Sequence, residues 1–200
     1  MNETDTPRAE AECGRLDAEE REENAGKARE TAERLFPGHE WRKVEDGIYL
    51  SPRRPIGKKS SYAGELRNAQ MLRDMGYTVY LAPEQRSVAG AKFDAIVNGL
   101  LFEFKNVSGN ANTLEAQFLR SRSQAPNVFI NLGNSDLTRR EIISALHWAR
   151  NSRSRMLANG KTIKGYDAVN RFIGGKIILK IRGHDGLFCL DVDDLKIQRE

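Results

Sequence analysis

The chain has 200 residues, of which 39% are hydrophobic and 30% charged, a composition typical of a globular domain with a short appendage. No run of about 18 apolar residues is present, so we expect no membrane insertion, and the N-terminus lacks the pattern of a signal peptide. The formal net charge of +4 divides into −5 over residues 1–35 and +9 over residues 36–200. A basic body favours a polyanionic partner such as nucleic acid.

The cysteines and histidines give little sign of a structural site. Cys13 and Cys189 stand far apart and predict two isolated thiols in a reducing compartment, not a disulfide framework. The three histidines are scattered, without the spacing of a structural zinc site.

The first 60 residues divide into two segments. Residues 1–34 form an acidic tail that we expect to be disordered or partly helical, with helix favoured from Asp17 to Leu35. Residues 35–60 predict a lead-in hairpin around Asp46-Gly47, followed by a basic linker that carries Arg54, Lys58 and Lys59. A solvated loop is the commoner interpretation of such a linker, and contact with substrate phosphates is the alternative.

Residues 61–200 predict one nuclease-like domain whose core spans residues 61–133. The core elements follow the order α-β-β-β-α-β, and the chain is then extended by a long helix and a second hairpin. In chain order we expect a helix at 62–75, strands at 77–81, 92–97 and 100–107, a helix at 113–124, a strand at 127–132, a helix from 137 or 138 to about 156, and strands at 177–181 and 187–192.

The Asn98-Gly99 pair fixes the register of the central hairpin. A two-residue turn pairs Val97 with Leu100, so Asp94 is placed opposite Glu103, and Lys105 follows on the same face. Two carboxylates directly opposite each other on a sheet are destabilising, and a bound cation removes the conflict. Oxygen ligands suit Mg²⁺ or Mn²⁺ best, with Zn²⁺ as a further candidate.

Glu65 is the fourth candidate, because it interrupts an otherwise apolar helical stripe. It shares that stripe with Ala69 and Leu72, which face the expected core. A carboxylate on such a face needs a cation, a metal-bound water or a lysine beside it. An exposed Glu103–Lys105 ion pair is the ordinary alternative for the short motif alone, but the combination of register, buried-face glutamate and element order favours a metal site for phosphodiester cleavage.

These residues resemble the PD-(D/E)XK nuclease superfamily, which has an αβββαβ, restriction-endonuclease-like core with a mixed sheet. In that superfamily the first helix carries an acidic residue, the second strand an Asp and the third strand Glu-x-Lys. Here these are Glu65, Asp94 and Glu103-Phe104-Lys105. Within it, the segments at 64–66, 77–79, 92–94, 102–107 and 127–130 resemble the C-terminal tRNA-nuclease domain of CdiA-type contact-dependent growth inhibition toxins.

The resemblance implies a toxin that cleaves tRNA in the bacterial cytoplasm, is delivered by a larger or exported system, and is blocked by a cognate immunity protein. Asp94 and Glu103 would hold the metal, with Glu65 binding it directly or through water, and Lys105 would orient the attacking water. Asn106 and Gln117 are candidates for substrate contact, although each is more often a solvated surface residue.

Three interpretations of the function remain open at this point. The first is an RNA-cleaving toxin, which the resemblance favours. The second is a DNA endonuclease of restriction or repair type, because the same metal chemistry serves either backbone. The third is a non-catalytic nucleic-acid-binding module on the same fold.

Overall fold

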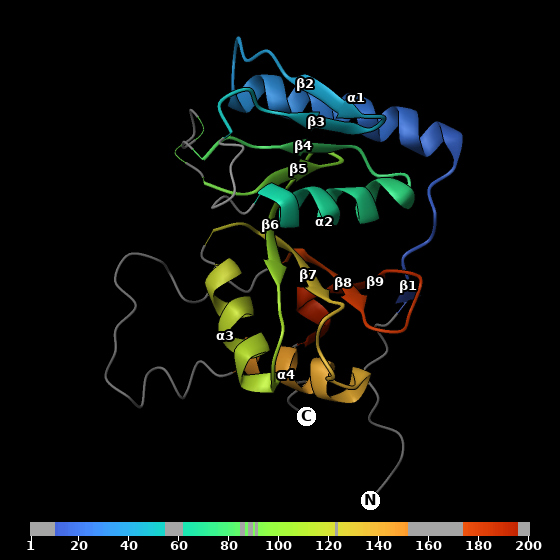
Figure 1. Cartoon of the computed structure of the whole chain (residues 1–200), viewed down its shortest axis with the longest axis vertical. Helices are drawn as coiled ribbons and strands as arrows, with labels where there is room; N and C mark the ends of the chain where they lie inside the picture. The colour runs from blue at the N-terminus through green and yellow to red at the C-terminus, as the bar shows by residue number, and fades with distance from the viewer. Residues whose placement is uncertain are drawn as a thin grey trace, which may run out of the picture. The chain divides into compact units, whose positions relative to one another are not determined.

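The computed structural model describes residues 11–54, 62–84, 87, 90, 92–122, 124–151 and 174–195. The fold is mixed α/β, and the chain divides into two compact units (Figure 1). The N-terminal unit is Gly14–Phe104, and the C-terminal unit is Lys105–Glu200 together with Met1–Cys13. The division falls within strand β6 (Leu100–Asn106).

Helix α1 (Ala18–Leu35) is formed by the acidic segment and begins at a capping box. The Asp17 carboxylate accepts the Glu20 N–H at 2.9 Å, and the Glu20 carboxylate accepts the Asp17 N–H at 3.0 Å. Ala28, Ala32 and Leu35 are buried, so one narrow apolar face packs against the unit. The predicted helix is therefore confirmed, and the predicted disorder is not found for residues 17–35.

The sheet of the N-terminal unit runs in the order β2-β3-β4-β5-β6. The expected lead-in hairpin is formed by β2 (Arg42–Glu45) and β3 (Ile48–Leu50), with Gly47 at φ 74° in the turn. Strand β3 pairs in parallel with β4 (Val79–Leu81), whereas β4 pairs antiparallel with β5 (Ala95–Val97) and β5 antiparallel with β6. The sheet is mixed, as predicted.

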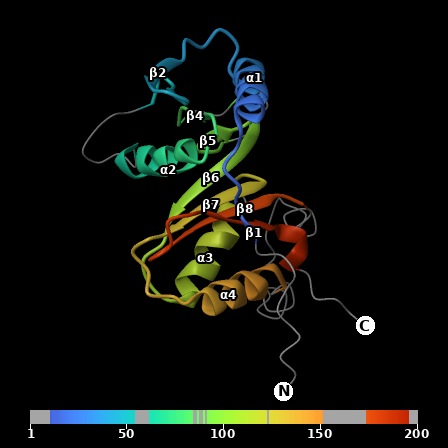
Figure 2. The same ribbon diagram turned by 90° about the vertical axis from the view of Figure 1, so that its right-hand side faces the viewer.

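Helices cover both faces of this sheet. Figure 2 shows β4 and β5 between α1 and α2 (Tyr62–Asp74). For this reason all residues of β4 and β5 are buried. Their sequences do not alternate between apolar and polar residues, as those of a half-exposed sheet would. The buried side of α2 carries Glu65, Asn68, Ala69 and Leu72, which confirms the predicted stripe.

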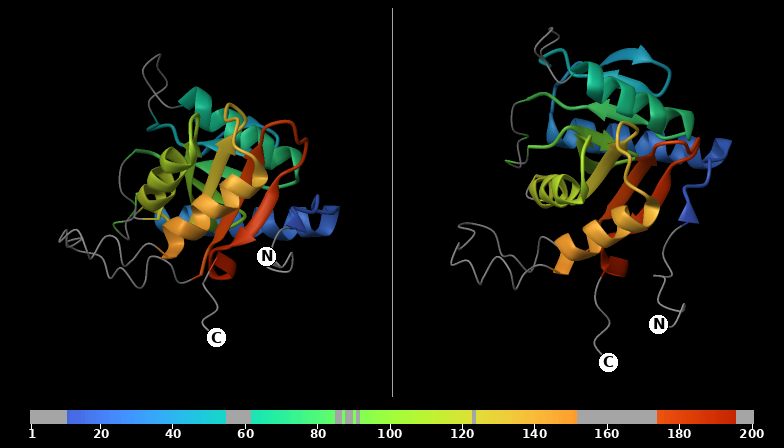
Figure 3. Two further views of the ribbon diagram at one scale, coloured as in Figure 1. Left: turned by 90° about the horizontal axis from the view of Figure 1, so that it is seen from below. Right: turned by 60° about the horizontal axis from the view of Figure 1, so that its bottom comes forward.

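The C-terminal unit packs two helices on a second group of strands, in the order β7-β8-β9-β1. Helices α3 (Ala111–Ser121) and α4 (Arg139–Asn151) lie side by side against β7 and β8 (Figure 3). A buried cluster that includes Leu114, Phe118, Ile130 and Leu146 forms the core. The strands and the closing 3₁₀ helix are β7 (Asn127–Leu132), β8 (Lys176–Ile181), β9 (Phe188–Asp191), β1 (Ala11–Glu12) and η2 (Val192–Leu195).

The chain order α2-β4-β5-β6-α3-β7 confirms the predicted αβββαβ core. The long helix and the second hairpin follow as expected, although the predicted extension of the helix to Met156 lies outside the described residues. Within the described ranges, no helix is both long and apolar enough to cross a bilayer.

The cysteines correct the sequence-based expectation. Cys13 and Cys189 form a disulfide with a Cα–Cα distance of 5.3 Å, although 176 positions separate them. Backbone pairing brings them together, since β1 pairs with β9 and the Cys13 N–H donates to the Leu187 carbonyl at 2.8 Å. Sequence spacing alone carries no sign of such a long-range pairing. The argument for a reducing compartment from isolated thiols therefore fails.

Candidate active site

The central hairpin has the register that the sequence predicts. Asn98 and Gly99 have φ values of 49° and 83°, the positive values that a two-residue hairpin turn requires. Val97 pairs with Leu100, Ile96 with Leu101 and Ala95 with Phe102. The strand pairing ends there, one residue after Asp94 on the first strand and one residue before Glu103 on the second.

Asp94 lies just before β5 and reaches across to β6. Its N–H donates to the Phe102 carbonyl at 3.0 Å, and its carboxylate accepts the Phe104 N–H at 2.8 Å. These two bonds hold Asp94 against the residues on either side of Glu103, whose side chain is buried at 3% exposure. Asp94 is thus held against the β6 backbone that flanks Glu103, and the meeting of the two carboxylates at a metal stays a prediction.

Glu65 is buried on α2 and forms an ion pair with the guanidinium of Arg54, through Nη2 and Oε2. The exposed fractions of the two side chains are only 5% for Arg54 and 7% for Glu65. Because solvent is excluded, removal of either partner would leave a buried, uncompensated charge. The cation that the sequence demanded beside Glu65 is therefore Arg54.

Arg54 also contacts the backbone carbonyls of Ala82 and Asp94. Its Nη1 donates to the Ala82 carbonyl and more weakly, at 3.4 Å, to the Asp94 carbonyl. Burial lowers the pKa of the Arg54 guanidinium, and the negative charges of nearby groups that include Asp94 and Glu103 oppose this shift. Arg54 thus pairs with the Glu65 carboxylate and lies next to the Asp94 backbone.

The turn before α2 explains why Arg54 is buried. The Ser51 N–H donates to the Leu81 carbonyl at 3.1 Å, and the Arg54 N–H donates to the Ser51 carbonyl at 3.1 Å. The Ser51 hydroxyl lies 2.6 Å from Nε2 of His39, and burial lowers the pKa of that histidine. Arg54 is therefore not part of the solvated linker that the sequence indicated, because these bonds fold it onto the end of β4. The sequence held one sign of this role for Arg54: a glutamate on a buried helix face needs a cation beside it.

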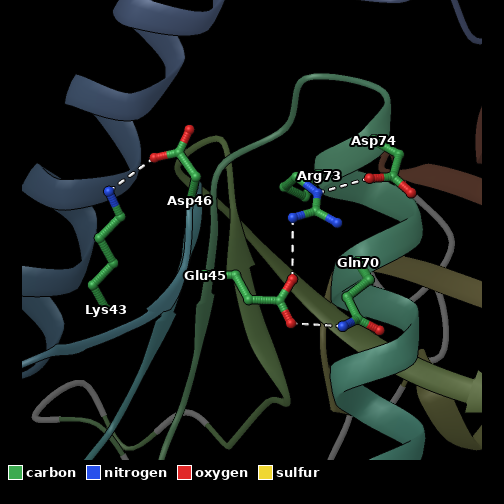
Figure 4. Close-up of polar contacts among 6 residues, drawn as sticks. All are labelled: Lys43, Glu45, Asp46, Gln70, Arg73 and Asp74. Carbon is green, nitrogen blue, oxygen red and sulfur yellow. Dashed lines mark hydrogen bonds and ion pairs between the residues drawn. The ribbon is translucent and has the colours of Figure 1, made fainter.

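A second ion-pair network on α2 differs in exposure. Arg73 contacts Glu45 at 3.1 Å and Asp74 at 2.7 Å, and Gln70 donates to Glu45 at 2.7 Å (Figure 4). The Arg73 and Glu45 side chains are 32% and 30% exposed. Solvent screening makes such a pair weak, so this network fastens β2 to α2 without the cost of buried charge.

The remaining predicted residues are spread over other parts of the chain. Lys105 is partly buried and Asn106 exposed on β6, while Gln117 is partly buried on α3. These three belong to the C-terminal unit. Lys58 and Lys59 lie outside the described residues.

The carboxylates can be compared with what a divalent ion requires. Among the residues that the structure describes, no three His, Cys, Asp or Glu side chains group as metal ligands. Mg²⁺ commonly uses only one or two protein carboxylates and keeps several waters. With Glu65 paired to Arg54, the donor set that suits such an ion is Asp94 and Glu103.

The C-terminal unit contains one cavity among its described residues. It has a volume of about 400 Å³ and lies between α3 and α4. The lining includes Asn112, Glu115, Arg140 and the exposed Trp148, and none of the predicted site residues.

Comparison with known proteins places the similarity over the central part of the chain. Residues 91–169 match the model of the contact-dependent growth inhibition CdiA C-terminal domain family. No curated protein matches the chain. A solved structure, a CdiA-CT/CdiI toxin and immunity complex from Burkholderia pseudomallei, is similar with 22% identity and a TM-score of 0.46, covering 70% of this chain and 97% of that chain. The segment that carries Asp94, Glu103 and Lys105 is thus the segment that is similar to CdiA C-terminal domains.

Proposed function

We propose that this protein is a divalent-metal-dependent endonuclease that cleaves tRNA and acts as a bacterial toxin domain. The observation that carries the proposal is that the Asp94 carboxylate is bonded to the β6 backbone directly beside the buried Glu103. Neighbouring carboxylates repel each other, and a bound cation offsets this repulsion. The match of residues 91–169 to the CdiA C-terminal family supports a toxin that acts on nucleic acid.

In this proposal Asp94, Glu103 and the Phe104 carbonyl would hold Mg²⁺ or Mn²⁺. When bound, the ion supplies Lewis-acid polarisation of the phosphate and an activated water. Lys105, two residues after Glu103 on β6, would orient the attacking water and offset charge on the phosphate through its ammonium group. Glu65, which is paired with Arg54, would bind the ion directly or through a water molecule.

The choice of an RNA substrate rests on charge and on family resemblance. Residues 36–200 carry a net charge of +9, which favours attraction to a phosphate backbone. Asn106, Gln117, Lys58 and Lys59 are the proposed contacts to that backbone. Because the chain resembles CdiA-type toxins, we also propose a cognate immunity protein as partner and delivery of the domain into target cells.

The test is incubation of the purified protein with total tRNA, ribosomal RNA and plasmid DNA, each with Mg²⁺, Mn²⁺, Zn²⁺ or EDTA. We expect discrete tRNA fragments with Mg²⁺ or Mn²⁺ and none with EDTA. Cleavage of plasmid alone would replace tRNA by DNA as the substrate. Binding of nucleic acid without cleavage under any condition would favour a non-catalytic module.

A further inference from the structure

We propose that Arg54 is a positioning residue of this nuclease site, which sets the location of Asp94 and Glu65 through one buried guanidinium. The inference rests on the proposed function and adds a residue to it. Arg54 does not contact substrate, because its side chain is only 5% exposed. Its effect on the site is indirect, through the positions of Glu65 and Asp94.

Arg54 joins polar atoms from several parts of the N-terminal unit. Its two terminal nitrogens contact the Glu65 carboxylate on α2, the Ala82 carbonyl after β4 and the Asp94 carbonyl before β5. These groups come from three separate segments of the N-terminal unit. A planar guanidinium fixes the directions of its donors, so it fixes these segments relative to one another.

The Asp94 backbone is bonded on both sides. The Ala82 N–H donates to the Asp94 carbonyl at 2.9 Å, and Arg54 donates to both of these residues' carbonyls. The Asp94 carboxylate meanwhile accepts the Phe104 N–H. Movement of the Ala82 and Asp94 backbone would therefore move the carboxylate that is proposed to bind the ion.

Charge adds to this geometry. The Arg54 guanidinium and the Glu65 carboxylate form one neutral pair, and Asp94 and Glu103 carry two formal negative charges, which a single divalent ion would balance. Outer groups that orient metal ligands typically contribute about 10- to 100-fold to metal affinity or activity. Arg54 is placed as such a group.

Arg54→Lys tests this role, because lysine keeps the positive charge and loses the planar fork. Any change in metal affinity then reflects geometry, since the local net charge is conserved. We expect Mn²⁺ binding, measured by calorimetry without RNA, to weaken about tenfold or more, and kcat on tRNA to fall by a similar factor. The KM for tRNA should stay within about twofold, because Arg54 is not a substrate contact.

Arg73→Lys is the matched control on α2. It conserves charge in the same way, but its ion pair with Glu45 is solvent-screened (Figure 4). We expect Mn²⁺ affinity and kcat within about twofold of the wild type. Equal losses in Arg73→Lys and Arg54→Lys would contradict a specific role for Arg54.

Ser51→Ala is the milder second variant, for use if Arg54→Lys does not fold. It removes only the hydroxyl that bonds the turn carrying Arg54, and leaves Arg54 and all carboxylates in place. A smaller loss of the same sign is expected, about threefold in Mn²⁺ affinity, because one orienting contact of the turn is lost.

The outcomes separate this proposal from the function on which it rests. A wild type that binds and cleaves, with Arg54→Lys or Ser51→Ala lowering only the melting temperature, would reduce Arg54 to a structural residue. A wild type that neither binds Mn²⁺ nor cleaves tRNA would overturn the nuclease and the positioning role together.

Discussion

Lys105 lies two residues after Glu103 on β6 and is partly buried. Its proposed task is to bind water and phosphate, not the metal. Lys105→Met should therefore retain metal-induced stabilisation while kcat on tRNA falls about 100-fold or more, as for loss of a group that acts in the transition state. Melting curves with and without Mn²⁺, together with single-turnover cleavage, check this. Loss of the metal-induced shift would instead place Lys105 in the metal site.

The residues of the site differ in how far the sequence could reveal them. Asp94 and Glu103 could be placed together because a two-residue turn leaves one register. Glu65 could be recognised as anomalous, because its apolar neighbours at helical spacing predict a buried face. Arg54 could not be assigned, since its position depends on Ser51 pairing with Leu81, a contact between segments about 30 residues apart.

At the scale of elements, the turn between β5 and β6 sets the geometry on which the site depends. Gly99 has a φ of 83°, and a Cβ there would lie 3.2 Å from the backbone oxygen of Lys27 on α1. Gly99→Ala should therefore lose stability through backbone strain and through steric conflict, by about 2 kcal/mol or more. Urea unfolding monitored by circular dichroism measures this difference.

Gly183→Ala is the matched control for the turn. Gly183 has a similar φ of 77°, but a Cβ there would meet no atom within 4 Å. It should lose only the strain contribution, about 1 kcal/mol. Equal losses in the two variants would show that α1 does not constrain the turn.

The elements themselves were predictable where local patterns are strong. The helix expected from Asp17, the Asn98-Gly99 turn and the apolar stripe of α2 are all found within a few residues of their predicted positions. The burial of α1 was not predictable from composition, because a face as small as Ala28, Ala32 and Leu35 gives little periodic signal. This small apolar face can bury α1 only because the helix has a sheet to pack against.

At the scale of the whole molecule, the Cys13–Cys189 disulfide ties residues near the two ends of the described chain. A crosslink over such a long segment restricts the unfolded chain, and disulfides typically contribute about 2–4 kcal/mol. Cys13→Ser/Cys189→Ser, or reduction of the wild type, should therefore lower the melting temperature by roughly 4–15 °C. Dithiothreitol should not affect the double variant. An unchanged melting temperature on verified reduction would contradict a stabilising disulfide.

The central claim is that Asp94 and Glu103 hold the ion that makes the molecule a nuclease. Asp94→Asn and Glu103→Gln each remove one negative charge and hardly change size, and the amide introduced by Asp94→Asn keeps an oxygen to accept the Phe104 N–H. The most direct measurement is the cleavage rate of total tRNA by the wild type and both variants, in Mg²⁺ or Mn²⁺ and in EDTA. We expect metal-dependent cleavage by the wild type and losses of about 1,000-fold or more in both folded variants, from about 4 kcal/mol of lost transition-state stabilisation. Wild-type rates in either variant, or undiminished cleavage in EDTA, would contradict it.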